Sequence, residues 1–185
     1  MKEWNKKREI RRSYDLSATV YDAQYSEEQN AKIKAALSHI PLKKSHLALD
    51  VGCGTGILSE HIGRSVKLLV GLDISSKILK EAKKRTQRFP KIALVCADAD
   101  STPFPNGMFD DVFAITLLQN MPDPVLTLRE MKRVSKRHSI IAVTGLKKEF
   151  SLSTFTRLLA QAGLKAFAIK TDDQLKGYVA VCRKI

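Results

Sequence analysis

Residues 47–64, LALDVGCGTGILSEHIGR, contain the most informative pattern for the fold class. An apolar, strand-like run leads into three alternate glycines at 52, 54 and 56, and a helical pattern follows at once. Glycines let a backbone turn tightly and approach a ligand closely, and the N-terminus of the next helix presents free N–H groups to an anion. A dinucleotide-binding loop needs G-x-G-x-x-G, but Ile57 stands where its third glycine belongs. The spacing therefore argues against a pyrophosphate cofactor.

Outward from this loop, short apolar runs alternate with amphipathic stretches. Strands are predicted at 46–52, 67–73, 92–98, 110–116, 139–145, 165–171 and 177–183, and helices at 56–63, 75–88, 123–135 and 151–162. Strand-helix-strand units pair in parallel, whereas only residues 172–176 separate the last two strands, which predicts an antiparallel hairpin. The expected fold is α/β: a seven-stranded, mostly parallel, doubly wound sheet with one antiparallel edge strand and helices on both faces.

The length of 185 residues predicts one domain overall. Within it, residues 1–40 form a basic arm and a lid helix, placed at about 27–39 and expected to lie over the carboxyl edge of the sheet, and residues 41–185 form the ligand-binding domain. No apolar run reaches the roughly 20 residues that span a bilayer, and no secretory leader is recognised, so we expect no membrane partner and a cytoplasmic protein. The three cysteines and four histidines lack metal-ligand spacing, so no metal is expected.

The net charge of +13 makes a polyanionic partner plausible, although a lysine-rich surface also serves solubility. Basic and aromatic residues gather in the N-terminal arm, which is the combination that an exposed nucleic acid strand requires. Candidate substrate or lid residues there are Trp4, Arg8, Arg11, Arg12, Tyr14, Tyr21 and Tyr25. For the tyrosines, packing of the arm onto the core is an equally open role.

Three stretches, DVGCGTG (50–56), LVGLDIS (69–75) and CADADSTPFPNGMFD (96–110), together resemble the class I S-adenosylmethionine (SAM) dependent methyltransferases. The resemblance implies SAM as the cofactor. It implies that Asp73 accepts hydrogen bonds from the ribose hydroxyls, that Ile74 lies beside the adenine, and that Asp98 meets the adenine amino group. The implied cofactor residues are Asp50, Gly52, Gly54, Gly56, Asp73, Ile74, Asp98, Ala99 and Ala114. For Asp50, bracing the glycine loop and reaching the cofactor's ammonium group both stay open.

The acceptor side is less well defined. The tetrapeptide of amine-methylating relatives is absent, because residues 115–118 read Ile, Thr, Leu, Leu. Thr116, Gln119 and Asn120 follow the fourth predicted strand, at the edge where open α/β sheets bind ligands, and are the candidate catalytic residues. A capping or turn role for Asn120 stays open, and Asp123 before Pro124 is expected to be a helix N-cap.

The chain also resembles compact archaeal RNA methyltransferases. Together with the charge, this predicts methylation of a nucleobase nitrogen in RNA, with ribosomal favoured over transfer RNA and the exocyclic amine of cytidine as one target. One alternative is a small-molecule methyltransferase of the quinone or metabolite type, because the Tyr-Asp segment at 14–25 and the run TPFPNGMFD also occur there. The other is a SAM-binding interaction subunit without catalysis.

Overall fold

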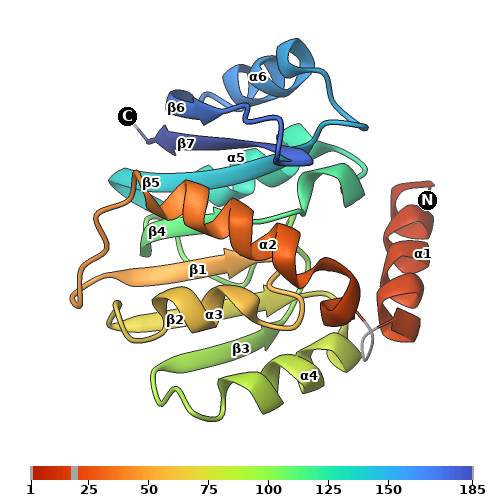
Figure 1. Ribbon diagram of the computed structural model, residues 1–185, viewed down its shortest axis with the longest axis vertical. Helices are drawn as coiled ribbons and strands as arrows, with labels where there is room; N and C mark the ends of the chain where they lie inside the picture. The colour runs from red at the N-terminus through yellow and green to blue at the C-terminus, as the bar shows by residue number, and fades with distance from the viewer. Residues whose placement is uncertain (1, 18–20, 185) are drawn as a thin grey trace.

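The computed structural model describes residues 2–17 and 21–184 (Figure 1). Its strands are β1 Leu47–Val51, β2 Leu68–Asp73, β3 Ile92–Cys96, β4 Phe109–Ala114, β5 Ser135–Leu146, β6 Lys165–Lys170 and β7 Gly177–Arg183. Its helices are α1 Lys2–Ser17, α2 Tyr21–Leu37, α3 Ile57–Ile62, α4 Ser76–Thr86, the 3₁₀ turn η1 Leu118–Asn120, α5 Pro124–Val134 and α6 Leu152–Gln161. No helix of the described residues is long and apolar enough to cross a membrane.

The seven strands form one sheet in the order β3-β2-β1-β4-β5-β7-β6, which confirms the predicted α/β fold. Strands β1 to β5 pair in parallel, and β7 runs antiparallel to both β5 and β6. The antiparallel strand thus lies one place inside the edge, since the short turn after β6 folds β7 back between β6 and β5. The strand order reverses between β1 and β4, where open α/β sheets bind their ligands.

Helices cover both faces of the sheet, with α2 and α3 on the near face in Figure 1 and α5 on the far one. Neighbouring residues of one strand accordingly enter different cores. Ala48 of β1 packs with Ile33 of α2, whereas Leu49 packs with Leu128 of α5. Burial on both faces explains why the inner strands β1, β2 and β4 read as continuous apolar runs rather than as alternating patterns.

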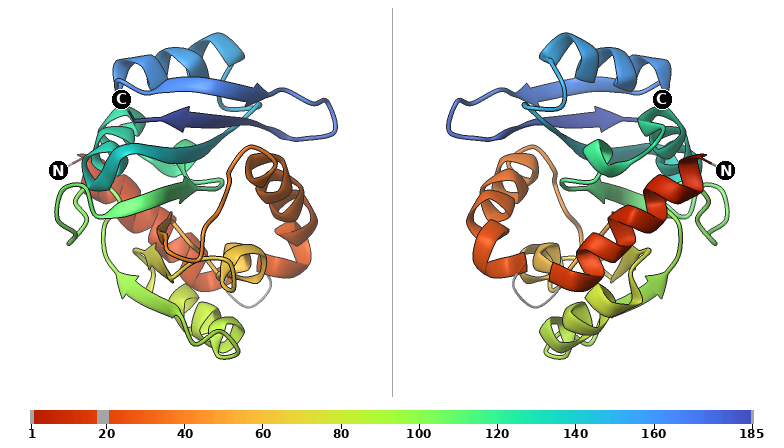
Figure 2. Two further views of the ribbon diagram at one scale, coloured as in Figure 1. Left: turned by 90° about the vertical axis from the view of Figure 1, so that its left-hand side faces the viewer. Right: turned by 90° about the vertical axis from the view of Figure 1, so that its right-hand side faces the viewer.

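The N-terminal region is more helical than expected. The predicted helix at 27–39 begins earlier, at Tyr21, and most of the basic arm forms α1. Both helices were underestimated because their polar residues show little apolar periodicity. Figure 2 shows α1 crossing the carboxyl ends of the strands, as expected for the basic arm. The predicted lid helix was misplaced, because α2 covers one face of the sheet (Figure 1), where its Ile33 and Ala36 join the apolar core.

Three helix starts follow from local side-chain chemistry. Asp123 accepts hydrogen bonds from the N–H groups of Val125 and Leu126, with Pro124 at the first helical position, which confirms its predicted capping role. Ser75 caps α4 and Ser151 caps α6 in the same way. These caps orient α4 and α5 at the edge of the sheet that carries the glycine loop.

Candidate functional site

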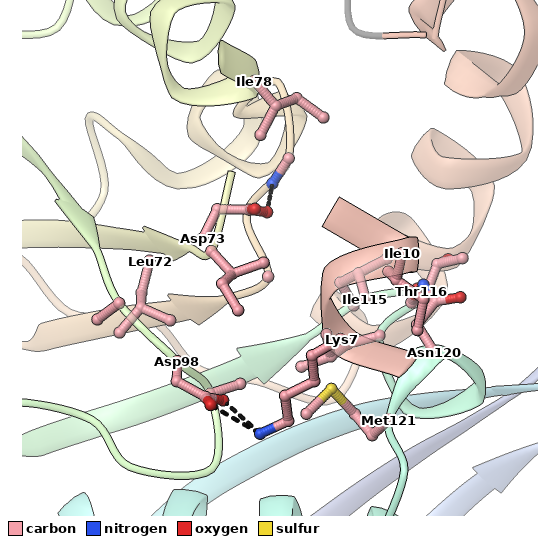
Figure 3. Close-up of a pocket in the computed structure, with 16 residues that line it drawn as sticks. Lys7, Ile10, Leu72, Asp73, Ile78, Asp98, Ile115, Thr116, Asn120 and Met121 are labelled. Carbon is pink, nitrogen blue, oxygen red and sulfur yellow. Dashed lines mark hydrogen bonds and ion pairs between the residues drawn. The ribbon is translucent and has the colours of Figure 1, made fainter. Parts of the chain in front are cut away.

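A pocket opens at the carboxyl ends of β1, β2 and β4, with α1 as its outer wall (Figure 3). It combines the glycine loop, two carboxylates and an apolar end. The lining residues are Lys7, Ile10, Gly52, Gly54, Leu72, Asp73, Ile74, Ile78, Ala97, Asp98, Ala99, Ile115, Thr116, Leu117, Asn120 and Met121. Eight of the twelve predicted cofactor and catalytic residues therefore line this one pocket.

The glycine loop adopts left-handed backbone angles at Gly52 (φ 71°) and Gly54 (φ 54°), which side chains disfavour. The loop is held by the N–H groups of Gly52 and Cys53, which both donate to the carbonyl of Leu72 at 2.7 and 2.9 Å. A Cβ at Gly52 would lie 2.8 Å from Leu117 Cδ1, whereas one at Gly54 would meet only Ile78 Cδ1 at 3.9 Å. The loop therefore leaves an open cradle at Gly54, beside the pocket.

Asp73 ends β2 and connects the loop to α4. Its carboxylate accepts hydrogen bonds from the N–H of Gly54 at 3.0 Å and from that of Ser75 at 2.9 Å. Burial raises the pKa of Asp73, and the backbone donors oppose that rise only in part. The carboxylate thus braces the cradle while facing the pocket (Figure 3), where its remaining lone pairs suit two hydroxyl donors.

Asp50 lies deeper, in the wall of a second, smaller cavity that also touches Gln29, Gly54 and Thr55. Burial, followed by the negative charge of Asp73, raises the pKa of Asp50 to about 7. No described residue donates a hydrogen bond that offsets these effects. The loop is therefore braced by Asp73 and by Leu72, and the other predicted role of Asp50, contact with a cationic group of the ligand, stays a prediction.

Lys7 of α1 reaches Asp98, 91 residues away, and was missed by the sequence analysis as a pocket residue. Its ammonium group donates to both carboxylate oxygens of Asp98 at 2.8 and 2.7 Å and lies 2.5 Å from Asp100 (Figure 3). Burial alone would lower the pKa of Lys7, but the bonds to Asp100 and Asp98 outweigh it and raise the pKa. No local pattern distinguishes this lysine from the other basic residues of the arm.

A second contact fastens the other end of α1. Ser75, the cap of α4, donates its hydroxyl to Asp15 of α1, so the helix is held across the pocket at two points. Ile10 points inward from the same helix (Figure 3), while Arg8, Arg11, Arg12 and Trp4, the last 59% exposed, face solvent. The predicted lid residues Tyr14, Tyr21 and Tyr25 lie outside the described side chains.

At the opposite end of the pocket, Thr116 adopts a left-handed conformation (φ 62°), and its N–H, hydroxyl and carbonyl groups are all hydrogen-bonded. Its N–H donates to Thr144 Oγ1 at 2.6 Å and its hydroxyl to Gln29 Oε1 at 2.8 Å. Its carbonyl accepts from the side-chain amides of Gln119 at 2.6 Å and Asn120 at 3.4 Å. A non-glycine residue at positive φ that is fixed this way marks a functional candidate.

The structure separates the predicted residues into three groups. Thr116 and Asn120 line the pocket, although the amide of Asn120 also serves the turn, as the open alternative held. Gln119 does not line it, because its amide caps the turn at Thr116. Gly56 and Ala114 do not line it either: Gly56 caps α3 and Ala114 is fully buried in β4.

The donor set fits SAM. Two carboxylates, Asp73 and Asp98, suit hydroxyl and amino donors, Ile74 and Ile78 offer apolar surface between them, and the open cradle at Gly54 admits the ligand backbone. Asp73 would hold the ribose of SAM, and Asp50 would face its ammonium group. Asp98 would bind the adenine amino group once Lys7 shares or releases the Asp98 carboxylate. Within residues 2–17 and 21–184, no group of three or more metal-ligating side chains gathers.

Known proteins resemble this chain in sequence and in fold. A demethylmenaquinone methyltransferase of Lysinibacillus sphaericus is 39% identical over 104 residues, 54% of this chain and 44% of that protein. A malonyl-[acyl-carrier protein] O-methyltransferase of Marinomonas is 30% identical over 146 residues, 77% of this chain and 53% of that protein. The chain thus spans about half the length of these curated relatives. The crystal structure of a SAM dependent methyltransferase from Aquifex aeolicus matches with a TM-score of 0.79 at 18% identity, covering 92% of this chain and 98% of that one.

The family model described as a methyltransferase domain matches residues 49–143, just over half of the chain. That range begins at the strand before the glycine loop and ends in β5, and it contains Asp73, Asp98 and Thr116. The chain therefore belongs to the methyltransferase-domain family, as a class I, Rossmann-like member with SAM as its cofactor.

Proposed function

We propose that this protein transfers a methyl group from SAM to a small organic acceptor. The observation that carries the proposal is the apolar end of the pocket, where Ile10, Ile115, Leu117 and Met121 adjoin the glycine cradle. An enclosed apolar surface with a few polar groups is typical of small-molecule sites. The relatives named above support it, since their names specify a quinone and a carrier-bound malonyl group as acceptors.

SAM, when bound, supplies an electrophilic methyl group. The residues of this chain act mainly by position: Asp73 and the glycine loop orient the cofactor, and the apolar residues place the acceptor in line and exclude water. Thr116 and Asn120 line the pocket, and we assign to the hydroxyl of Thr116 and the amide of Asn120 the orientation of the acceptor atom.

The predicted RNA acceptor gains no support from the comparisons, because neither the family description nor the relatives named above mention RNA. What favours it is the charge of +13 and the exposed face of α1 with Arg8, Arg11 and Arg12. This face lies outside the pocket wall, whereas the wall itself is formed by Lys7 and Ile10. RNA is therefore the competing outcome of the test rather than the proposal.

The test measures transfer of radiolabelled methyl from SAM to a metabolite extract and, in parallel, to fractionated RNA, both from cells that lack this protein. The Asp73→Ala variant serves as the control for dependence on the cofactor site. We expect Asp73-dependent label in the metabolite fraction. Label confined to RNA would overturn the proposal in favour of the RNA acceptor, and SAM binding without any transfer would favour the interaction subunit.

A further inference from the structure

Lys32 of α2 is a buried cation behind the acceptor end of the pocket. Its side chain is 2% exposed, and it is one of the largest fully buried side chains among the described residues. A charged amino group at such a depth is costly unless it is paired and hydrogen-bonded. None of the roles described above uses this group.

Two partners hold the ammonium group. Its Nζ lies 3.2 Å from Glu28 Oε1, one turn earlier on α2, and 3.3 Å from the hydroxyl oxygen of Thr116. Glu28 Oε1 is also bound by the N–H of Lys176 at 2.9 Å, on the turn before β7. The ammonium group of Lys32 therefore contacts both Glu28 and Thr116, and Thr116 is the contact that connects it to the pocket lining.

The ion pair is poorly explained by stability. Apolar replacements of buried ion pairs are often neutral or stabilising, because two charges must lose their water. Burial also lowers the pKa of Lys32, so the surroundings disfavour its charged form. A long apolar side chain such as methionine would occupy a similar volume without that cost.

We propose that Lys32 is a specificity-determining residue that selects an acceptor reacting through an anionic oxygen, namely a phenolate, enolate or carboxylate. It acts through Thr116, whose hydroxyl oxygen accepts from Lys32 and whose proton is free to turn from Gln29 to an oxyanion in the pocket. The inference rests on the proposed function and deepens it by naming the acceptor class. The O-methyltransferase among the relatives is consistent with this class.

The chemistry balances without another reactant. The acceptor hydroxyl loses its proton to water, and the positive end of the Glu28 and Lys32 pair favours the resulting anion. One oxygen–carbon bond then forms as the sulfur–methyl bond breaks, so the anion and the sulfonium both become neutral. An amine acceptor would instead develop positive charge beside Lys32 during transfer, which the same field disfavours.

The experiment measures binding to the protein saturated with S-adenosylhomocysteine, so it does not depend on turnover. Its probes are fluorescent 1-hydroxy-2-naphthoate and its neutral methyl ester, which share one ring system. We expect the anion to bind about tenfold more tightly than the ester, the strength of one good charge interaction. Lys32→Met should reduce this ratio to about one while the affinity for the ester changes less than about twofold.

Three further variants keep the result interpretable. Glu28→Gln should also reduce the preference for the anion, because it removes the carboxylate that keeps Lys32 charged against the effect of burial. If Lys32→Met alone unfolds the protein, Glu28→Gln combined with Lys32→Met removes both charges and should show the same loss of preference. Lys34→Met, an exposed lysine of the same helix, is the matched control and should leave the ratio unchanged.

A merely structural role for Lys32 would weaken both probes equally. A ratio that survives Lys32→Met, or a wild-type protein that prefers the ester, overturns the inference. Failure of S-adenosylhomocysteine to bind would instead count against the proposed function, and it is measured separately before either probe is added.

Discussion

The two ends of the pocket are built in different ways. At the cofactor end, Gly52, Gly54, Asp73 and Asp98 follow three consecutive strands, and each lies where its strand ends. At the acceptor end, Thr116 contacts Gln29 and Lys32, which are 87 and 84 residues away. The first end is a product of local order along the chain, and the second depends on how the N-terminal helices pack on the sheet.

Asp73 offers the strongest test of the cofactor end of the pocket. Asp73→Ala removes the acceptor for the Gly54 and Ser75 N–H groups and the predicted partner of the ribose hydroxyls. Since hydrogen bonds to a charged group are worth about 1.5–3 kcal/mol each, we expect the affinity for S-adenosylhomocysteine to fall at least about 100-fold by calorimetry. Asp173→Ala, an exposed acid in the β6–β7 turn, is the matched control. A loss below tenfold would place the ribose elsewhere.

Asp50 tests the same end through protonation. Because its pKa is raised to about 7, the folded state binds the proton more tightly than the unfolded state, so the free energy of unfolding falls as pH rises from about 4 to about 7. Asp50→Asn should remove this slope and stabilise the ligand-free protein at pH 8 by about 1–4 kcal/mol. Urea unfolding at pH 5 and pH 8 measures both values. An unchanged slope in the variant would assign the pH dependence to other groups.

Lys7 tests whether α1 obstructs or supports the cofactor. Its ammonium group occupies both oxygens of Asp98, which is the predicted acceptor for the adenine amino group. We therefore expect Lys7→Met to tighten S-adenosylhomocysteine binding about fivefold, the size of a part-exposed ion pair, and to reduce its salt dependence. Lys6→Met, its exposed neighbour, controls for the lost charge. Weaker binding would show instead that Lys7 secures the helix over the bound cofactor.

The outer face of α1 should have the smallest effect. Replacing Arg8, Arg11 and Arg12 together by glutamine alters side chains that are exposed and do not line the pocket. We expect S-adenosylhomocysteine affinity and methyl transfer to the metabolite fraction to change less than about twofold, because exposed charges are screened by water and salt. A large loss of transfer would mean that this face contributes to acceptor binding.

The fold was predictable because its elements are specified locally. The apolar runs, the glycine loop and the caps at Ser75 and Asp123 each act within a few residues, and their alternation constrains the sheet topology. The N-terminal helices were less predictable from the sequence. Helix α1 is polar nearly throughout, and its position depends on contacts of Lys7 with Asp98 and of Asp15 with Ser75, the cap of α4. Propensity alone does not locate such contacts.

The candidate site divides along the same line. Gly52, Gly54, Asp73, Ile74, Asp98 and Ala99 were predicted from contiguous motifs and all line the pocket, whereas Gln119 was predicted from its position alone and turned out to cap a turn. Lys7 and Lys32 were missed as site residues. The sequence does not distinguish a buried, paired lysine from the other basic residues, 32 in all, because its burial and its partners depend on helices and strands far away in the chain.

The α/β sheet, the glycine loop and the two acids that follow it are all readable from the amino-acid sequence, and so are the family and its cofactor. These depend on periodicity and spacing, which operate over one strand and one turn. Three features depend instead on how distant segments pack: Lys7 pairs with Asp98, Thr116 takes a left-handed conformation between Gln29 and Thr144, and Lys32 is buried behind Thr116. Those features arise when α1 packs across the carboxyl ends of the strands and α2 packs on one face of the sheet, because this packing brings residues more than 80 positions apart within hydrogen-bond distance.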